Sequence, residues 1–527
     1  MRDFQKSNRS ISYSSNGMVA TSHPIASIVG LDILKKGGNA VDAAIAMALV
    51  LPICEPQSTG LFGDVFAMIK PSDNDNFVGI NGSGKAPKNI SPHTLRQKFQ
   101  FAIPEDAVET ITMPGAVAAF ESLNRKFGKM ELSDLCQPAI NYSEKGVIVS
   151  PRVAFDWSHS FNHLKKYSKK FYSNNGKPLL AGDIFKSSGQ SEVLKKIAKF
   201  GAKGFYEGEV AKDFIDSLIE LGGVHEEDDF SSVTVEYVDP CKAKIGNCEL
   251  FEIPPNGQGL TAILILKILE KLEVYKLDAM CAKRVHLEAE AAKIAYLARD
   301  NFIADTKFYD LDYDIFMSDD KINSYVNLIK EDKVSDFNKI LDFTPHKDTV
   351  LLTVVDKNRQ MISLIFSIFN SFGSGYCSKK YGILFHNRGA GFNLKKGHPN
   401  EIIGGKRPLH TIIPAFLKEE KKFIMPFGVM GGQYQANGHA RLISNLLHHK
   451  MDIQSAIDFP RSFPFNGFLN LENGYNTDIA SKLEKIGHII SRPEQPIGGA
   501  QAILYDLKKD VLMGGSDPRK DGCALGY

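Results

Sequence analysis

The hydrophobic pattern of this chain changes near residue 342. Before that point apolar residues recur mostly at helical spacing, as they do through residues 115–225. From Thr349 onward come short runs rich in β-branched and aromatic residues, which are typical of strands: TVLLTVV, MISLIF, HTIIPAF, KFIMPF, AILYDL and VLMGG. Two helical stretches, 439–449 and 477–486, interrupt these runs. Helices gathered before and between strands predict a layered α and β structure.

Residues 25–51 predict two helices separated by a break at KGGN. A glycine there can end the first helix, and Asn39 can cap the second. The second helix, residues 40–51, is apolar almost all round and should therefore be buried. Three later segments continue the pattern, two as neighbouring strands and one as an amphipathic helix: 65–69, 77–80 and 284–302.

Charge and cysteine content exclude several classes of function. The 63 Lys and Arg residues nearly balance the 61 Asp and Glu residues, so we expect neither a nucleic-acid nor a membrane partner. No run reaches the ~18 apolar residues of a membrane span, and the first residues contain no apolar signal segment. Seven scattered cysteines without a CxxC pair argue against a disulfide framework or a thiolate zinc site. We therefore expect a cytoplasmic protein.

Thr349 opens a predicted strand directly after Asp348 and a polar stretch. The precursor of an N-terminal nucleophile enzyme requires this arrangement. Cutting the Asp348–Thr349 bond would give Thr349 a free α-amine beside its own hydroxyl. With an intrinsic pKa of ~7.7–8, that amine can act as general base to the hydroxyl. A threonine that starts a strand only because of its β-propensity fits the same position, so the pattern alone leaves both interpretations open.

A glycine-rich segment, GVMGG at residues 428–432, follows the run KFIMPF and precedes the predicted helix 439–449. Adjacent glycines at such a junction can direct backbone N–H groups at an oxyanion, and losing one such donor costs ~3 kcal/mol in other enzymes. An ordinary turn has the same pattern. The segment is not a phosphate-binding loop, because no GK[ST] follows it.

His286 and Glu290 are spaced i, i+4 on the predicted helix 284–302 and could in principle share a metal ion. No third ligand is evident from the sequence. We therefore interpret them as a helix-surface pair and expect no metal site.

These motifs lie within longer stretches that resemble the gamma-glutamyltranspeptidase family of N-terminal nucleophile hydrolases. The resemblance covers nearly the whole chain in the family's order: MVATSHPIASIVGLDILKKGGNAVDAAIAMALVLPICEPQSTG, MPGAVAAFESL, VHLEAEAAKIAYLARDNFIAD, DTVLLTVVDKN, SFGSG, YGILFHN, KRPLHTIIPAF, GVMGG and GGSDPRKDG. It implies an α+β fold, a four-layer αββα sandwich, formed by a precursor that cuts itself into a large chain, 1–348, and a small chain, 349–527. No cofactor is implied.

The resemblance also implies roles for individual residues. Thr349 matches the family's catalytic threonine. Ser367 matches a hydroxyl residue that hydrogen-bonds the nucleophile's amine, with serine in place of the usual threonine. Gly431 and Gly432 match the glycines of the oxyanion hole. The implied reaction is acyl transfer, in which Thr349 attacks an amide and water or an acceptor amine then releases the acyl group.

The residues with which family members grip the γ-glutamyl group are replaced in this chain. Ser83 stands where an arginine binds the α-carboxylate, and His410-Thr411 replace a serine pair. Gly391 stands where an acidic residue binds the α-amine. Three further departures surround the site: Arg388 replaces a neutral residue, Phe369 replaces an asparagine, and Asp64 lies in a segment that is usually glycine-rich.

These replacements remove the residues that bind the α-carboxylate and the α-amine of the γ-glutamyl group, and they keep the nucleophile. A site without the acidic residue should not select strongly for a free α-amine. Arg388 could instead bind a substrate carboxylate, or it could form a structural ion pair. We expect Arg388, His410, Thr411 and Ser83 to contact the substrate. The variant pattern resembles a divergent branch of the family that includes glutathione hydrolase-like proteins and an oxamate amidohydrolase.

Three hypotheses remain. The first is a self-cleaving enzyme that hydrolyses γ-glutamyl amides such as glutathione, with hydrolysis favoured over transfer. The second is an amidohydrolase of another small, carboxylate-bearing amide such as oxamate. The third is an inactive homologue kept as a binding protein, which the presence of Thr349, Ser367 and the glycine pair argues against. The expected partners are a small-molecule amide and the two chains of one precursor; a higher homo-oligomer is left open.

Overall fold

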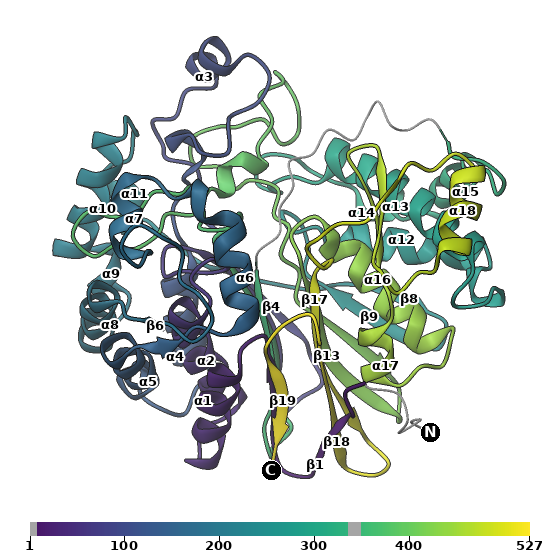
Figure 1. Ribbon diagram of the computed structural model, residues 1–527, viewed down its shortest axis with the longest axis horizontal. Helices are drawn as coiled ribbons and strands as arrows, with labels where there is room; N and C mark the ends of the chain where they lie inside the picture. Colours follow the sequence, from purple (N-terminus) through teal and green to yellow (C-terminus); the bar gives the residue numbers. More distant parts are fainter. Residues whose placement is uncertain (1–7, 336–348) are drawn as a thin grey trace.

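A computed structural model describes residues 8–335 and 349–527. Two seven-stranded antiparallel sheets pack face to face at its centre, and helices cover the outer face of each sheet (Figure 1). The fold is therefore the four-layer αββα sandwich that the resemblance implied.

The strand that follows Thr349 lies inside one of these sheets, called sheet B. Three of its adjacent strands, β10, β11 and β3, are buried at every residue, because helices cover one face and the other sheet covers the other. In spatial order the strands are β19 (Cys523–Gly526), β2 (Met18–Thr21), β10 (Val350–Val355), β11 (Met361–Ser367), β3 (Asp64–Lys70), β4 (Val78–Gly82) and β7 (Glu236–Val238).

The second sheet, sheet A, contributes the strand that leads into the glycine pair. In spatial order its strands are β1 (Ser12–Ser14), β18 (Val511–Ser516), β17 (Gly499–Asp506), β13 (Phe423–Met430), β12 (Ala415–Glu419), β9 (Cys248–Glu252) and β8 (Cys241–Ile245). Each sheet thus combines strands from both sides of residue 349.

Sheet B is covered by helices from the first half of the chain (Figure 1). The central helix is buried at every position, as predicted, and packs on β10 and β11. Asn39 caps it by accepting hydrogen bonds from the N–H groups of Val41 and Asp42. The helices of this layer are α1 (Pro24–Lys35), α2 (Ala40–Cys54), α4 (Ala116–Phe127), α5 (Leu132–Lys145) and α8 (Ser188–Phe200).

Sheet A is covered by α12 (Gly259–Lys271), α16 (Tyr434–Leu447) and α17 (Ile453–Asp458) (Figure 1). Outside α12 lies α13 (Ala282–Phe302). The sequence predicted an amphipathic helix here, but α13 is buried on all sides from Arg284 to Tyr296. The reason is that α12, α18 (Thr477–Lys485) and β14 (Ser462–Phe465) enclose it.

The remaining elements surround this sandwich. They are β5 (Val147–Ile148), β6 (Ile184–Phe185), β15 (Phe468–Leu471), β16 (Ile490–Ser491), α3 (Pro92–Phe99), α6 (Pro151–Ser160), α7 (Lys166–Phe171), α9 (Lys203–Tyr206), α10 (Gly208–Glu220), α11 (Glu227–Ser231), α14 (Tyr313–Phe316), α15 (Asp319–Val326), η1 (Val108–Thr110), η2 (Phe161–His163), η3 (Val274–Lys276) and η4 (Arg388–Gly391). Within the described ranges, no helix combines the length and apolar character that a membrane crossing needs.

Most of the predicted strands are confirmed. The runs at 65–69 and 77–80 correspond to β3 and β4, which pair with each other. The run HTIIPAF becomes a strand only from Ala415, because its first residues turn into the site described below. The sequence did not predict β8, β9 or α17.

Candidate active site

Thr349 and Ser367 meet at one end of two paired strands. Thr349 directly precedes β10, Ser367 ends β11, and the antiparallel register places Val350 opposite Phe366. The Thr349 hydroxyl donates a 3.3 Å hydrogen bond to Ser367 Oγ. Both residues are buried. Asp348, on the other side of the predicted cleavage bond, lies outside the described residues.

The glycine pair approaches this end from sheet A. The carbonyl of Phe427 accepts a 2.8 Å hydrogen bond from Ser363, which is paired with Thr353. One residue further along β13, a Cβ on Gly428 would come within 2.8 Å of Leu351. The end of β13 therefore lies toward the end of β10 that follows directly after Thr349.

Gly431 and Gly432 follow the end of β13 and have φ angles of 125° and 57°, which favour glycine. A Cβ on Gly431 would also lie 2.8 Å from the Cα of Gly498. These constraints fix the path of the backbone at the position predicted for an oxyanion hole.

A buried amide connects this turn to the predicted substrate residues. Gln258 Nε2 donates hydrogen bonds to the carbonyls of Thr411, at 2.7 Å, and Gly432, at 3.3 Å. Arg299 in turn donates a 2.7 Å bond to Gln258 Oε1. Gln258 thus fixes Thr411 beside the glycine pair.

Asp64 is the centre of a charged cluster next to Ser367. It stands opposite Ser367 in the register of β3 and β11. Its carboxylate accepts hydrogen bonds from Gly84 N–H and from His410 Nε2, both at 3.0 Å. Arg388 Nε lies 3.7 Å from the same carboxylate and His386 Nδ1 lies 3.6 Å from it. All four side chains are fully buried.

The charge states in the Asp64 cluster follow from this burial. Burial lowers the pKa values of His410 and His386 to about 3, so both rings are neutral at pH 7. His410 Nδ1 accepts from the N–H of Ile412, which leaves the proton on Nε2, facing Asp64. Burial lowers the pKa of Arg388 to about 9, against the attraction of Asp64, so its guanidinium stays charged.

Arg388 is connected to Ser367 through Phe369. Its guanidinium carbon lies 4.0 Å from the centroid of the Phe369 ring, and the Phe369 N–H donates to Ser367 Oγ at 2.9 Å. Nη1 of Arg388 donates a 3.0 Å bond to the Thr411 hydroxyl. Nη2 is buried and has no hydrogen-bond partner among the described residues. The arginine therefore forms the structural ion pair, while neither Nε nor Nη2 donates a hydrogen bond to the described residues.

Ser83 lies apart from this cluster. Its hydroxyl donates to Asn81 Oδ1 at 2.6 Å and accepts from Asn256 Nδ2 at 3.2 Å. It lines a separate cavity of about 190 Å³ together with Lys85 and Lys88. The structure thus gathers Arg388, His410 and Thr411 near Ser367, the partner of Thr349, and leaves Ser83 bound to protein groups.

The backbone packing around residue 391 accounts for the glycine at the position where the family has an acidic residue. A Cβ there would come within 2.8 Å of the Leu409 carbonyl. A larger side chain would require the neighbouring backbone to shift.

The profile of the family described as gamma-glutamyltranspeptidase matches residues 26–527. The chain belongs to this family. A similar curated protein is the glutathione hydrolase-like YwrD proenzyme of Bacillus subtilis (strain 168), with 30% identity over 97% of this chain and 98% of that protein. Another is the oxamate amidohydrolase proenzyme of Klebsiella pneumoniae, with 27% identity over 98% of this chain and 99% of that protein.

Among solved structures, the cephalosporin acylase from Bacillus halodurans has a TM-score of 0.90. It shares 32% identity, with 100% of this chain and 99% of that chain covered. This gamma-glutamyltranspeptidase family member is therefore an enzyme of the amide hydrolase and acyltransferase type, in the N-terminal nucleophile hydrolase fold.

In this family member, the prediction that His286 and Glu290 form a surface pair is wrong. Both are fully buried in α13, and His488 adds a third possible ligand, so that one ligand atom from each of the three residues lies within 4.8 Å of the others. However, Lys293 already pairs with Glu290 at 2.5 Å, and His286 Nδ1 and His488 Nε2 share a 2.8 Å hydrogen bond. An ion pair to Glu290 and hydrogen bonds to His286 and His488 thus already engage all three side chains.

Sequence reasoning noted Asp64 as a departure and gave it no role. It also missed Gln258, which has no motif around it. The one available signal for Asp64 was its place at the start of a predicted strand in a glycine-rich segment. Its partner Arg388 lies more than 300 residues away, so no local pattern could connect them.

Proposed function

We propose that this chain is a self-cleaving amide hydrolase in which Thr349 becomes the first residue of a small chain, 349–527, and attacks the substrate. The observation that carries the proposal is the hydrogen bond between the buried hydroxyls of Thr349 and Ser367, at the end of the sheets that Gly431 and Gly432 approach. The proenzyme names of the curated relatives support the cleavage.

The proposed reaction uses groups of this chain alone. The α-amine of Thr349 takes the proton from its own hydroxyl, and Oγ1 adds to the amide carbonyl carbon. Backbone N–H groups of the glycine pair donate to the oxyanion. The C–N bond then breaks, and the amine leaves with the proton from the α-ammonium. Water hydrolyses the remaining ester, which releases a carboxylic acid and restores Thr349; an acceptor amine in place of water would give a new amide.

For the acyl group, γ-glutamyl amides such as glutathione are the first candidates, in line with the name of the YwrD relative. A second class, small carboxylate-bearing amides such as oxamate, is favoured by one specific observation. The buried Nη2 of Arg388 has no hydrogen-bond partner among the described residues and could donate to a carboxylate, whereas Gly391 leaves no acidic group for an ammonium.

Maturation tests the nucleophile. Denaturing electrophoresis of the purified protein should show bands of about 38 and 20 kDa, by proportion of the 58.2 kDa chain. Thr349→Ala should leave one full-length band, because cleavage and catalysis share one hydroxyl. Thr353→Ala is the matched control: it removes a buried threonine from the same strand and should still give two bands. Cleavage in Thr349→Ala, or an intact wild-type chain that is active, would refute the assignment.

A substrate panel separates the two acyl classes. The mature protein is incubated with L-γ-glutamyl-4-nitroanilide, glutathione and oxamate, and released 4-nitroaniline, glutamate or oxalate is measured. Release of glutamate supports the first class, and release of oxalate supports the second. A correctly cleaved protein that turns over none of the three would contradict both.

A further inference from the structure

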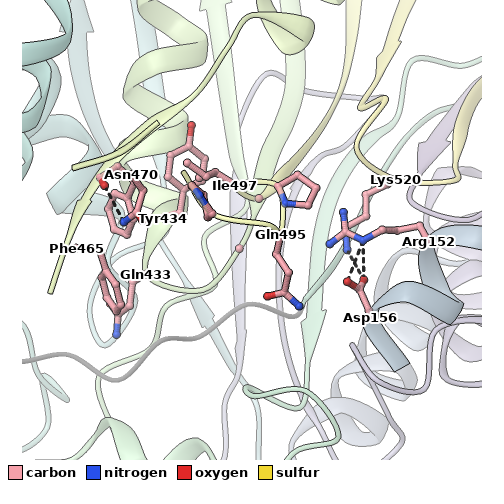
Figure 2. Close-up of a pocket in the computed structure, with 14 residues that line it drawn as sticks. Arg152, Asp156, Gln433, Tyr434, Phe465, Asn470, Gln495, Ile497 and Lys520 are labelled. Atoms are coloured by element: carbon pink, nitrogen blue, oxygen red, sulfur yellow. Dashed lines mark hydrogen bonds and ion pairs between the residues drawn. The ribbon is translucent and has the colours of Figure 1, made fainter. Parts of the chain in front are cut away.

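The cavity beside Gly431 has a volume of about 180 Å³ and lies where the two halves of the sandwich meet. Figure 2 shows aromatic side chains, including Tyr434 and Phe465, on one side and a charged group on the other. The charged group comes from α6, which carries Arg152 and Asp156, and from the loop between β18 and β19, which carries Lys520. The cavity is thus lined by Gly431, a proposed oxyanion donor, and by the cations Arg152 and Lys520.

The aromatic side of this cavity is a wall of rings packed against one another. The rings of Phe463 and Phe465 are stacked with centroids 5.7 Å apart, and Tyr434 packs edge-on against Phe463 at 5.5 Å. Such a wall can bury a ring or a large apolar side chain of a ligand.

Among the residues that line the charged side, the two cations Arg152 and Lys520 outnumber the single acid Asp156. Arg152 Nε contacts both carboxylate oxygens of Asp156 at 2.9 Å, so this acid is already neutralised. Lys520 is only 5% exposed, and its ammonium lies 3.8 Å from Asp156, beyond hydrogen-bond distance. Among the described residues no acceptor is within hydrogen-bond reach of this ammonium. This ammonium lines the cavity, where an anionic group of a ligand would supply the acceptor that it lacks.

Two other acids near Lys520 are engaged elsewhere. Asp521 accepts hydrogen bonds from the Ser150 hydroxyl and the Arg152 N–H. Glu55 accepts from the Ser22 hydroxyl, and burial raises the pKa of Glu55 to about 7 against the attraction of Lys520. Neither carboxylate supplies the missing hydrogen bond to the ammonium.

We propose that this cavity holds the amine side of the scissile amide and that Lys520 binds a carboxylate on it. The substrate class is then an acyl amide whose amine part joins an apolar or aromatic body to a carboxylate. The inference rests on the proposed function, because it takes Gly431 as an oxyanion donor. It places the acyl side toward Arg388, His410 and Thr411, which do not line the cavity.

A binding measurement tests the subsite without relying on catalysis. The mature protein is titrated by calorimetry with 5-amino-2-nitrobenzoate and with 4-nitroaniline, two amines that differ by one carboxylate. The wild type should bind the carboxylate at least about tenfold more tightly. Lys520→Met should abolish this difference and leave the affinity for 4-nitroaniline unchanged, while Lys520→Arg should retain most of it.

A second variant covers the case in which Lys520→Met fails to fold. Gln495 is half-buried and extends into the cavity between the two sides (Figure 2). Gln495→Glu adds a negative charge there and should weaken binding of the benzoate by about tenfold but not of 4-nitroaniline. The matched control is Lys88→Met, which removes a lysine from the separate cavity beside Ser83 and should change neither affinity. Equal wild-type affinities, or a benzoate affinity that neither Lys520→Met nor Gln495→Glu lowers, would overturn the proposal.

Hydrolysis then connects the subsite to the reaction. The ratio of kcat/KM for L-γ-glutamyl-3-carboxy-4-nitroanilide to that for L-γ-glutamyl-4-nitroanilide should be about 10 or more in the wild type and near 1 in Lys520→Met. If neither anilide is hydrolysed but the binding difference persists, γ-glutamyl hydrolysis is wrong and the subsite stands. If both are hydrolysed with the same ratio in the wild type and in Lys520→Met, the subsite is wrong and the proposed function stands.

Discussion

The Thr349–Ser367 pair and the Asp64 cluster are neighbours that are built in opposite ways. Thr349 and Ser367 are uncharged, and strand register and one weak hydrogen bond hold them together. Asp64, Arg388 and His410 form a fully buried network that contains an ion pair. A buried charge that loses its partner destabilises the fold more than a neutral hydroxyl that loses its partner. Substitutions should therefore affect mainly activity in the first region and mainly stability in the second.

The largest expected effect is on stability. Asp64→Ala leaves the Arg388 guanidinium buried without its counter-ion and should reduce the free energy of unfolding by about 3–5 kcal/mol. Urea denaturation measures this loss. Adding Arg388→Met removes the stranded charge, so the double variant should be more stable than Asp64→Ala alone. A double variant that loses the sum of both single effects would show that the two residues do not act as a pair.

Ser367→Ala should show the opposite behaviour. It removes the partner of the Thr349 hydroxyl and should lower kcat by about 100-fold, with KM nearly unchanged. The free energy of unfolding should change by no more than about 1 kcal/mol. Ser367→Thr keeps the hydroxyl and should restore most of the activity. The two-band pattern is checked first, so that a failure of maturation is not mistaken for a loss of turnover. A large loss of stability here would erase the contrast between the two regions.

The smallest expected effect concerns pH. Burial lowers the pKa of His410 to about 3, below the value of ~6.5 in an unfolded chain. Its contribution to stability is therefore fully present above pH 6.5 and is lost as the pH falls toward 3. Between pH 7 and pH 5.5 the wild type should lose about 1 kcal/mol through this residue. His410→Gln should lack that part of the loss, whereas a variant of the exposed His93 should retain it.

Local sequence patterns predicted many of the helices and strands. The β-branched runs gave β10 and β11, and the alanine-rich segment after Asn39 gave the buried helix α2. Only the family resemblance predicted that Ser367 would lie next to Thr349. The all-round burial of α13 could not be predicted, because its charged residues look exposed until their partners are known. Arg284, for example, pairs with Glu288 on the same helix and donates to Asn445 on α16.

The same limit applies to the Asp64 cluster and to the cavity of Lys520. Their members are brought together by sheet register and by a loop that passes from one sheet to the other, and neither leaves a periodic signal in the chain. Arg388 was singled out by its unusual position in the sequence. The choice between its two interpretations depended on Asp64, which lies on β3, whereas Arg388 lies in η4.

The distribution of strands on either side of residue 349 has a consequence for a nicked molecule. Sheet B receives β2, β3, β4 and β7 from the segment before this point and β10, β11 and β19 from the segment after it; sheet A is likewise mixed. Breaking one peptide bond there removes no strand from either sheet. The two fragments would remain interlocked without a covalent tether, should melt in a single cooperative transition, and should separate only when both sheets are dismantled.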